Sequence, residues 1–284
     1  MPPADIQKVV TTRTVVLTAL AMAAFAGNSI FCRLALARTA IDPATFTLVR
    51  MVSGAAMLAL LCVSTRRKLA GDWRMAAALL GYAVLFSYAY VALTAATGAL
   101  LLFGAVQATM ITRGIGAGER LAPLQWVGFG VAVVALASLL APGVAAPEPW
   151  HALLMIGSGI AWGFYSLLGR GQRDPLATTA GNFARGALLA LPLLLMPNLN
   201  WDSSGLVWAI MSGAVASGIG YAIWYAALPT LTATQAATVQ LSVPVIAALS
   251  GVALLGEALS VRLALTSAIV LIGIALVIRK PAGR

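Results

Sequence analysis

Ten apolar runs, each about long enough to cross a lipid bilayer as a helix, fill almost the whole chain of 284 residues. A spanning helix needs about 20 mostly apolar residues. Only 9% of the residues are charged and 61% are hydrophobic, whereas soluble domains carry roughly one-quarter charged residues. The runs cover residues 13–33, 43–63, 73–90, 92–113, 122–141, 150–168, 176–196, 205–228, 232–255 and 261–278. The sequence therefore predicts an all-α membrane protein with ten transmembrane helices.

The basic residues are distributed unequally between the two sides of these spans. Ten spans place both termini on one side, where 13 of the 18 lysines and arginines lie, against three on the other side (Arg33, Arg38 and Arg262). Short loops rich in Lys and Arg remain in the cytoplasm. We therefore expect a protein of the cell (inner) membrane with both termini cytoplasmic. The net charge of +10 is spread between hydrophobic runs and is not clustered beside aromatic readers, which argues against a nucleic-acid partner.

A Gly-Glu pair occurs twice at the end of an apolar run, at residues 118–119 and 256–257. Superposing the two pairs aligns spans 4 and 5 with spans 9 and 10 without a gap. Earlier features recur at similar offsets of 132 to 138 residues: residues 26–33 with 162–170, Asp42-Pro43 with Asp174-Pro175, and Arg50 with Arg185. Because five spans is an odd number, the second unit enters the membrane from the opposite side. The sequence predicts two inverted five-helix repeats, residues 1–143 and 144–284.

The Gly-Glu pairs have two interpretations. Gly118 and Gly256 can supply the left-handed residue that ends a helix, while Glu119 and Glu257 lie against the partially positive N-termini of spans 5 and 10. Alternatively, the glutamates carry protons. The structural interpretation is favoured because the partial positive charge at a helix N-terminus stabilises a nearby carboxylate.

Together these features resemble the drug/metabolite transporter superfamily, EamA type. The resemblance rests on ten spans in two halves, Trp162-Gly163 in span 6, an arginine inside spans 2 and 7, and Pro244 ahead of the second Gly-Glu pair. Within this group the chain is most similar to YddG-type exporters of aromatic and other amino acids, through "FSYAY" at 86–90. It departs from the pattern at Ala26, where a tryptophan is expected, and at Val106-Gln107, where a proline is expected.

The resemblance implies that spans 5 and 10 stand outside the other helices, which surround a central cavity. Transporters built from inverted repeats bind substrate near the midplane, where the repeats meet, and an amphipathic solute requires aromatic faces with a few polar groups. The candidate substrate-binding residues are Tyr82, Tyr88, Tyr90, Phe103, Gln107, Trp162, Tyr165, Tyr221 and Gln240. Trp224 and Tyr225 are lining candidates too, but residues near span ends also form interfacial aromatic belts.

Arg50 and Arg185 fall inside predicted spans. Each lies about eight or nine residues from the entry end, roughly 12 Å at 1.5 Å per residue. An intramembrane charge is a functional hypothesis by default, so a role in binding a substrate carboxylate is one interpretation. Their recurrence in both repeats favours a structural role, such as holding carbonyl groups of a neighbouring helix end. Both interpretations remain open.

The residues argue against an enzyme. Ser158 and His151 lie seven residues apart on one helix, about 10 Å along its axis, which is too far for a hydrogen bond. The eight acidic residues lie in tails, loops or span ends, and neither a metal cluster nor a cofactor is predicted.

Two classes of function fit these observations. The first is a transporter that exports amino acids, with aromatic ones favoured, and similar small metabolites by alternating access. The second is a non-transporting scaffold or sensor, and an exporter of other drugs or metabolites is a further alternative. Proton-coupled transporters usually carry a carboxylate or histidine buried near the substrate. The predicted spans contain no carboxylate, and the single histidine, His151, lies at the very start of its span. We therefore expect facilitated diffusion, with the solute and the lipid bilayer as partners.

Overall fold

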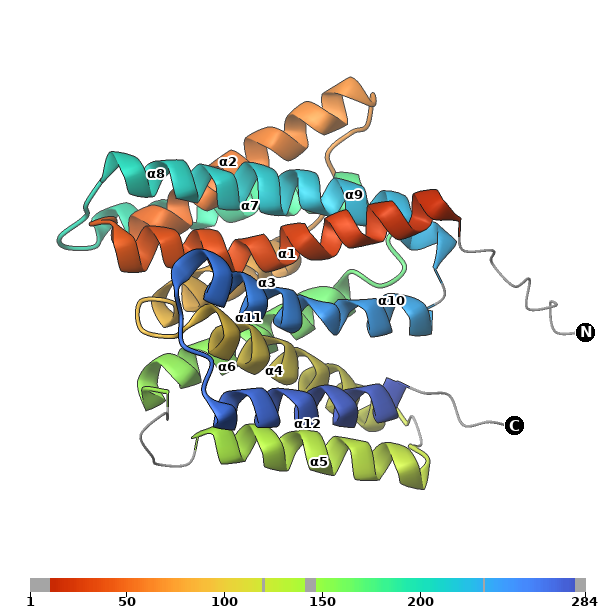
Figure 1. The fold of residues 1–284 in the computed structure, drawn as a ribbon. Coiled ribbons are helices and arrows are strands. Elements are labelled where there is room, and N and C mark those ends of the chain that lie inside the picture. The colour runs from red at the N-terminus through yellow and green to blue at the C-terminus, as the bar shows by residue number, and fades with distance from the viewer. Residues whose placement is uncertain (1–10, 119–120, 141–146, 232, 279–284) are drawn as a thin grey trace, which may run out of the picture.

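The computed structural model describes residues 11–118, 121–140, 147–231 and 233–278, and every regular element in these ranges is helical (Figure 1). Each predicted run holds at least one helix. The helices are α1 (Thr12–Arg38), α2 (Pro43–Ser64), α3 (Trp73–Ala89), α4 (Ala95–Gly116), α5 (Pro123–Leu140), α6 (Pro149–Leu168), α7 (Pro175–Leu189), α8 (Ser203–Ile210), α9 (Gly220–Ala227), α10 (Ala233–Gln240), α11 (Ser242–Leu255) and α12 (Val261–Ile278). The prediction of an all-α protein is confirmed for the described residues.

Seven helical segments, counted over the described ranges, are long and apolar enough to cross a membrane. They are Thr12–Arg38, Pro43–Ser64, Ala95–Gly116, Pro149–Leu168, Ser203–Thr230, Thr238–Leu255 and Val261–Ile278. α3, α7 and the described part of α5 are shorter, with 17 residues in α3 and 15 in α7. The count of ten spans therefore stays a prediction. The predicted boundary between the two repeats, at 143/144, lies outside the described residues.

Two predicted spans are interrupted by proline. The run 176–196 is helical only to Leu189 and continues as a 3₁₀ segment, η1 (Leu191–Leu195), which contains Pro192. The run 232–255 breaks at Leu241, between α10 and α11. Pro244 has no backbone N–H and cannot bond the carbonyl of Gln240, four residues earlier. The two apolar runs are therefore helical over most of their length, with a change of geometry beside each proline.

Aspartates define the start of four helices. Asp42, Asp72, Asp174 and Asp202 each precede a helix, and each carboxylate accepts hydrogen bonds from backbone N–H groups of the first turn at 2.8–3.1 Å. Each such cap contributes typically about 1 kcal/mol. The acidic residues that the spans exclude therefore set the helix boundaries.

Asp42 also joins two loops, because its second carboxylate oxygen accepts a hydrogen bond from the backbone N–H of Asn200 at 2.8 Å. Burial alone raises the pKa of Asp42. Hydrogen bonds from the Thr45 side chain and from the backbone N–H groups of Asn200, Thr45 and Ala44 outweigh that effect and hold the pKa below its ordinary value.

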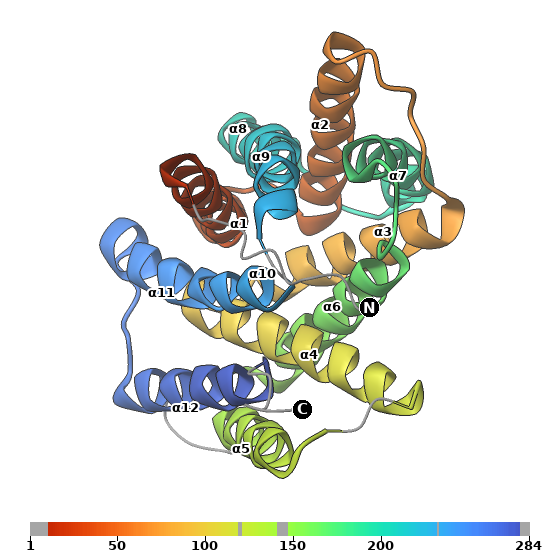
Figure 2. The ribbon, with the colours of Figure 1, turned by 90° about the vertical axis from the view of Figure 1, so that its right-hand side faces the viewer.

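The helices form one bundle in which α1 begins and α12 ends at the same end (Figure 1). α5 and α12 lie side by side at one edge of this bundle, as Figures 1 and 2 both show. The resemblance implied that spans 5 and 10 stand outside the others, and α5 and α12 occupy those spans. The remaining helices pack around one another.

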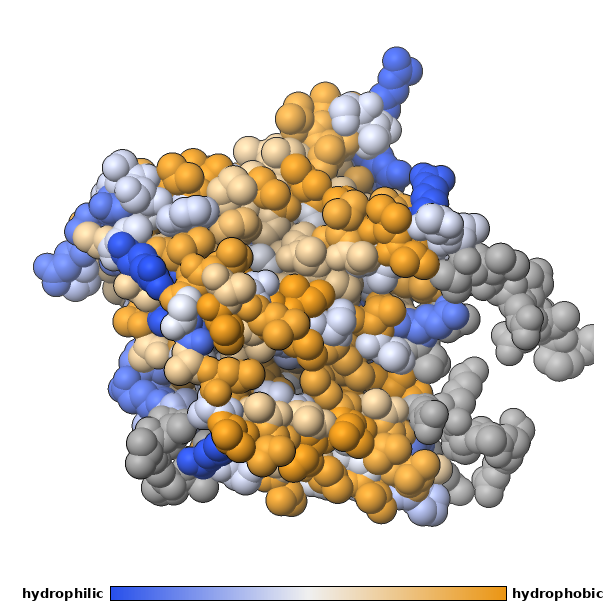
Figure 3. Space-filling model, in the orientation of Figure 1, coloured by the Kyte–Doolittle hydropathy of each residue, from blue (hydrophilic) through white to orange (hydrophobic). Residues whose placement is uncertain are grey.

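The surface is mostly apolar. On the face shown in Figure 3, hydrophobic residues dominate the middle, and hydrophilic residues gather toward the two ends of the helices. Exposed side chains include Leu60, Val63, Leu249, Val261 and Leu265, each at least 60% exposed. So large an apolar surface marks a site of interaction with membrane or protein when a chain is folded. Here it extends along the helices, as expected for contact with lipid.

Candidate functional site

A cavity of about 510 Å³ lies among seven helices. Its volume falls within the roughly 300–1,000 Å³ typical of small-molecule sites. Its lining residues are Phe25 of α1, Met75 of α3, Val106, Gln107 and Met110 of α4, Trp162, Tyr165 and Ser166 of α6, residues 169–172, Pro175, Thr178 and Thr179 of α7, Tyr221, Trp224 and Tyr225 of α9, Leu228, and Ala236 and Gln240 of α10. The cavity therefore receives side chains from both halves of the chain.

The cavity lies toward the end of the bundle at which α1 begins and α12 ends, which we call the open end. Arg170, Gly171 and Gln172 lie in the loop between α6 and α7, line the cavity and are exposed. α4 ends at this end of the bundle, and α7 begins there (Figure 1). A small solute can thus reach the cavity from the open end.

One wall of the cavity is a continuous aromatic surface. The Trp162 ring centroid lies 5.2 Å from that of Tyr165 and 5.8 Å from that of Tyr221, to which it is nearly parallel. Tyr221 is stacked in turn on Tyr225 at 6.0 Å and contacts Phe25 at 5.5 Å. Such rings offer a large apolar face and favour offset or tilted contacts with another ring.

Polar groups are interspersed with these rings. The Thr179 hydroxyl hydrogen-bonds the Tyr225 hydroxyl at 2.8 Å and accepts from the Tyr165 hydroxyl at 3.3 Å. Gln240 lies at the break between α10 and α11, and Gln107 faces the cavity from α4. Among the lining residues, which are all described, there is no acidic side chain and no histidine, and the single charge is Arg170 at the mouth.

Local backbone features place these side chains. Gly159 brings α6 against α4, since a Cβ at this position would lie 2.6 Å from the Leu102 carbonyl oxygen. The central part of the eighth run, η2 (Met211–Ile219), is a π-helix that leads into Tyr221. In this π-helix the hydroxyls of Ser212 and Ser217 donate to the Asn28 side-chain oxygen at 2.9 and 3.3 Å. π segments frequently occur at functional sites.

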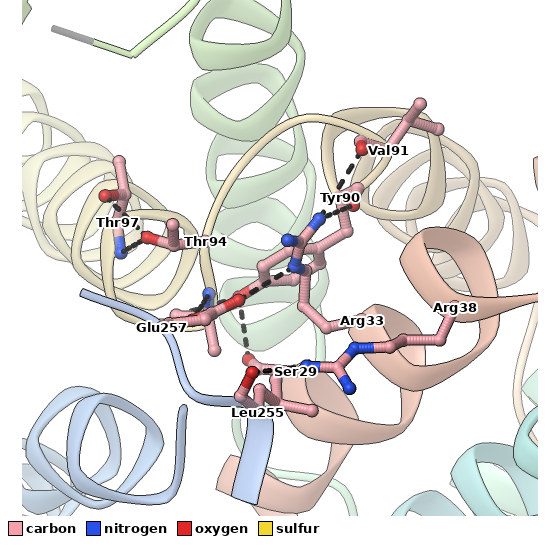
Figure 4. A network of polar contacts seen from close by, with 10 residues as sticks. Ser29, Arg33, Arg38, Tyr90, Val91, Thr94, Thr97, Leu255 and Glu257 are labelled. Atoms are coloured by element: carbon pink, nitrogen blue, oxygen red, sulfur yellow. Dashed lines mark hydrogen bonds and ion pairs between the residues drawn. The ribbon is translucent and has the colours of Figure 1, made fainter. Parts of the chain in front are cut away.

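A polar network joins the helices at the opposite end of the bundle, which we call the sealed end (Figure 4). Arg33 Nε forms an ion pair with Glu257 Oε1 at 2.9 Å, and Arg33 Nη1 donates to the Tyr90 carbonyl at 3.0 Å. The other Glu257 oxygen accepts from the backbone N–H of Ala95 at 2.8 Å. Arg38 also donates to the Leu255 carbonyl. The network ties the end of α1 to the start of α4 and to the end of α11.

The EamA-like transporter family model matches residues 12–141 and 149–279. The chain belongs to the EamA-like transporter family. It is thus a multi-pass membrane transporter, and the family assignment made from the sequence is confirmed. The similarity to YddG-type exporters remains a prediction.

Three relatives of this EamA-like transporter share its sequence to different extents. An uncharacterized protein of Pseudomonas aeruginosa is 56% identical over 277 residues, which cover 96% of each chain. The uncharacterized transporter YwfM of Bacillus subtilis is 29% identical over 134 residues, 45% of each chain. An uncharacterized transporter of Archaeoglobus fulgidus is 27% identical over 167 residues, 57% of this chain and 60% of the relative.

The fold has also been seen in a crystal structure. A solved protein with 20% sequence identity superposes with a TM-score of 0.67, covering 92% of this chain and 98% of the other. At this identity the similarity concerns the fold alone.

Five of the nine predicted substrate-binding residues of the EamA-like transporter line the cavity: Gln107, Trp162, Tyr165, Tyr221 and Gln240. Trp224 and Tyr225, the two further lining candidates, line it as well. Sequence reasoning missed Phe25, Thr178 and Thr179. The adjacent threonines, four and five residues after the Asp174 cap, were the available signal.

The other four predicted residues lie elsewhere. Tyr82 is buried one layer behind the aromatic wall, with its ring centroid 4.8 Å from that of Trp162. Tyr90 belongs to the sealed end, where its hydroxyl donates to Ser29 at 2.8 Å. Phe103 packs in the hydrophobic core, and Tyr88 is half-buried away from the cavity lining. Helical periodicity separates these positions, since residues two apart point to different faces.

The two intramembrane arginines have different surroundings. Arg185 donates to the carbonyls of Ala70 at 2.7 Å and Gly181 at 3.1 Å, and its guanidinium lies over the Trp73 ring. Arg185 therefore ties the loop between α2 and α3 to α7. Arg50 is 2% exposed and contacts aromatic side chains.

The Gly-Glu pairs are partly as predicted. Gly118 and Gly256 have φ of +92° and +65°, the left-handed conformation expected of a helix terminator. Glu257, however, caps the N-terminus of α4 and pairs with Arg33, so the prediction that it lies against span 10 is wrong. Glu119 lies outside the described residues.

Proposed function

We propose that this EamA-like transporter exports amino acids, with aromatic ones favoured, and similar small metabolites by alternating access. The observation that carries the proposal is the aromatic wall of Trp162, Tyr165, Tyr221 and Tyr225 in a cavity of about 510 Å³. An aromatic side chain can lie against these rings, while the glutamines and Thr179 offer hydrogen bonds to the polar part of the solute.

Alternating access is supported by the difference between the two ends. The cavity is reached from the open end, and the Arg33–Glu257 network closes the sealed end. We propose that the chain crosses the membrane ten times as two inverted five-helix repeats, residues 1–143 and 144–284. Such repeats exchange conformations about a site at their interface, which would close the open end and open the sealed one.

The direction of transport follows from the basic residues. Arg66, Arg67 and Lys68 lie in the loop after α2, and Arg170 and Arg173 in the loop after α6. Arg67 pairs with Asp174 at 2.7 Å, so the two loops are adjacent. By the positive-inside rule we place the open end in the cytoplasm of a cell with the protein in its inner membrane. Solute then loads from the cytoplasm.

The composition of the cavity favours facilitated diffusion. A proton-coupled carrier usually holds a buried carboxylate or histidine near its substrate, and neither type is present among the residues that line this cavity. An organic cation would likewise find no counter-charge. We therefore propose that a cytoplasmic excess of a zwitterionic or neutral solute drives export.

Purified protein in liposomes tests this proposal with a panel of labelled amino acids. We expect downhill flux of phenylalanine, tyrosine or tryptophan that exceeds the flux of alanine. Trp162→Ala should reduce this flux, whereas Phe164→Ala on the same helix, where the side chain is 43% exposed, should leave it unchanged. If the protein transports other metabolites and none of the amino acids, it is an exporter of those metabolites instead. Absence of flux for every solute, with folded protein present, would favour a scaffold or sensor.

A separate experiment tests the orientation. Cysteines placed singly in residues 65–72 should resist an impermeant thiol reagent added to intact cells. Labelling from outside at these positions would reverse the proposed direction of transport while leaving the cavity assignment intact.

A further inference from the structure

Arg50 of α2 is buried without a charged partner. Its Nη2 donates to the Tyr82 hydroxyl at 2.9 Å, and its guanidinium carbon lies 5.1 Å from the Tyr82 ring centroid and 4.9 Å from that of Phe86. Nε and Nη1 are buried and have no hydrogen-bond partner. None of the acidic side chains in the described ranges forms an ion pair with Arg50. The side chain is a permanent cation with two free donors.

This arrangement is energetically unfavourable unless a ligand completes it. An arginine does not lose its proton in a protein, and a buried charge without a partner is costly. The contacts with Tyr82 and Phe86 offset part of that cost, because a cation is attracted to an aromatic face. They leave Nε and Nη1 without acceptors. Arg185, in the corresponding position of the second half, is by contrast bonded to two carbonyls.

Only one aromatic layer separates Arg50 from the cavity. Tyr82 lies between Arg50 and Trp162, with its ring 4.8 Å from that of Trp162. A change in the position of Tyr82 would therefore expose the free donors to a solute in the cavity.

We infer that Arg50 is the subsite for the carboxylate of the transported solute. The inference rests on the proposed function and adds what that function lacks, an anion-binding group directly behind the wall of a cavity whose lining residues include no buried charge. The solute's aromatic part lies against Trp162 and Tyr221, and its carboxylate accepts from one of the two free donors, Nε or Nη1, which lie on different edges of the guanidinium. Recognition of a solute with no carboxylate would leave these donors unpaired.

A structural role for Arg50 makes a different prediction. If Arg50 only holds α2 against Tyr82 and Phe86 of α3, its replacement should weaken binding of all solutes equally. A carboxylate subsite instead predicts a loss that depends on the solute. The test is the ratio of dissociation constants for phenylalaninamide and phenylalanine, which differ in the carboxylate alone.

The ratio is measured by thermal stabilisation of the full-length protein in detergent. Because a hydrogen bond to a charged group is stronger than a neutral one, we expect wild-type protein to bind phenylalanine about 10- to 100-fold more tightly than the amide. In Arg50→Gln the ratio should fall to about 1 while the affinity for the amide stays nearly constant. In Arg185→Gln, the matched control, the ratio should remain that of wild type.

Three outcomes would overturn the inference: an unchanged ratio in Arg50→Gln, an equal loss for both ligands, or a wild-type ratio near 1. If Arg50→Gln does not fold, Arg50→Lys provides the test. Lysine keeps the positive charge but lacks the planar set of donors of a guanidinium, so the ratio of dissociation constants should fall only partly. An unchanged ratio would again contradict the subsite.

Failure of the proposed function is distinguishable from failure of the inference. If wild-type protein binds neither phenylalanine nor its amide, the proposed preference for aromatic amino acids is wrong. The carboxylate subsite is then tested with benzoate and benzamide. Tighter binding of benzoate that is lost in Arg50→Gln supports the subsite, and equal or absent binding of the two rejects it.

Discussion

Replacing Glu257 by glutamine should open the sealed end. Glutamine keeps the size and an oxygen acceptor for the Ala95 N–H, but it removes the ion pair with Arg33. The Arg33 and Glu257 side chains are only 16% and 10% exposed, so screening by solvent is limited. A hydrogen bond between charged groups contributes about 1.5–3 kcal/mol. The variant should therefore shift the equilibrium toward the form open at this end by roughly 10- to 100-fold, at 1.4 kcal/mol per factor of ten.

The native Cys32 thiol reports this opening. Cys32 is fully buried, one residue before Arg33, and Cys62 is the second free cysteine. In a Cys62→Ser background, the rate at which a methanethiosulfonate reagent modifies Cys32 should follow the population of the open form. We expect that rate to rise about 10- to 100-fold in Glu257→Gln.

Two comparisons make the result specific. Glu148→Gln is the matched control, because Glu148 is 58% exposed at the start of α6 and pairs only with His151 in the described structure. It should leave the rate unchanged. Arg33→Gln should raise the rate as much as Glu257→Gln does, and the double variant should add little, since both remove the same interaction. An unchanged rate in Glu257→Gln, or an equal increase in Glu148→Gln, would refute the assignment of this network as the closure.

Further measurements test the cavity, the energetics and one helix cap. Gln107→Ala should lower flux or alter solute preference at similar levels of folded protein, whereas Thr112→Ala, exposed on the same helix, should do neither. Flux should proceed without a pH gradient, and imposing one should not concentrate the solute; proton-driven accumulation would contradict facilitated diffusion. Asp42→Ala should destabilise the fold by about 1 kcal/mol at pH 7. Because the pKa of Asp42 is lowered on folding, its contribution is fully present above about pH 4 and is lost as the pH falls through the lowered pKa, so the difference between thermal melts of variant and wild type should shrink as the pH falls below about 4.

Hydropathy predicted the helices because every backbone polar group inside a bilayer must be satisfied within the segment. The residues that line the cavity were harder to predict. Trp162 and Gln107 could be proposed because deep polar groups facing lipid are costly. Tyr88 lies on the same helix as Tyr82, and Tyr90 follows directly at its end. All three have the same residue type, and a single sequence does not show which face of α3 meets its neighbours. The prediction therefore assigned all three tyrosines to the cavity, and the structure places none of them in its lining.

The partners of Glu257 could not be predicted at all. Arg33 lies 224 residues away in the sequence, and local reasoning offered only the adjacent helix N-terminus of span 10. The structure turns the carboxylate toward a different N-terminus, that of α4, where the helix dipole and the arginine act together. A carboxylate does favour a helix N-terminus, but the sequence alone could not show which helix N-terminus lies next to Glu257 in the tertiary structure.

A second pair of aligned arginines, Arg33 and Arg170, relates the network at the sealed end to the proposed transport cycle. Arg33 of the first half corresponds in the repeat alignment to Arg170 of the second. Arg33 is held in the network at the sealed end, whereas Arg170 is exposed at the mouth of the cavity. Two equivalent halves that occupied equivalent conformations would surround both arginines alike. For the inverted repeats that we propose, this difference is the asymmetry that alternating access requires, and the proposal predicts that a state open at the sealed end exposes Arg33 and buries Arg170.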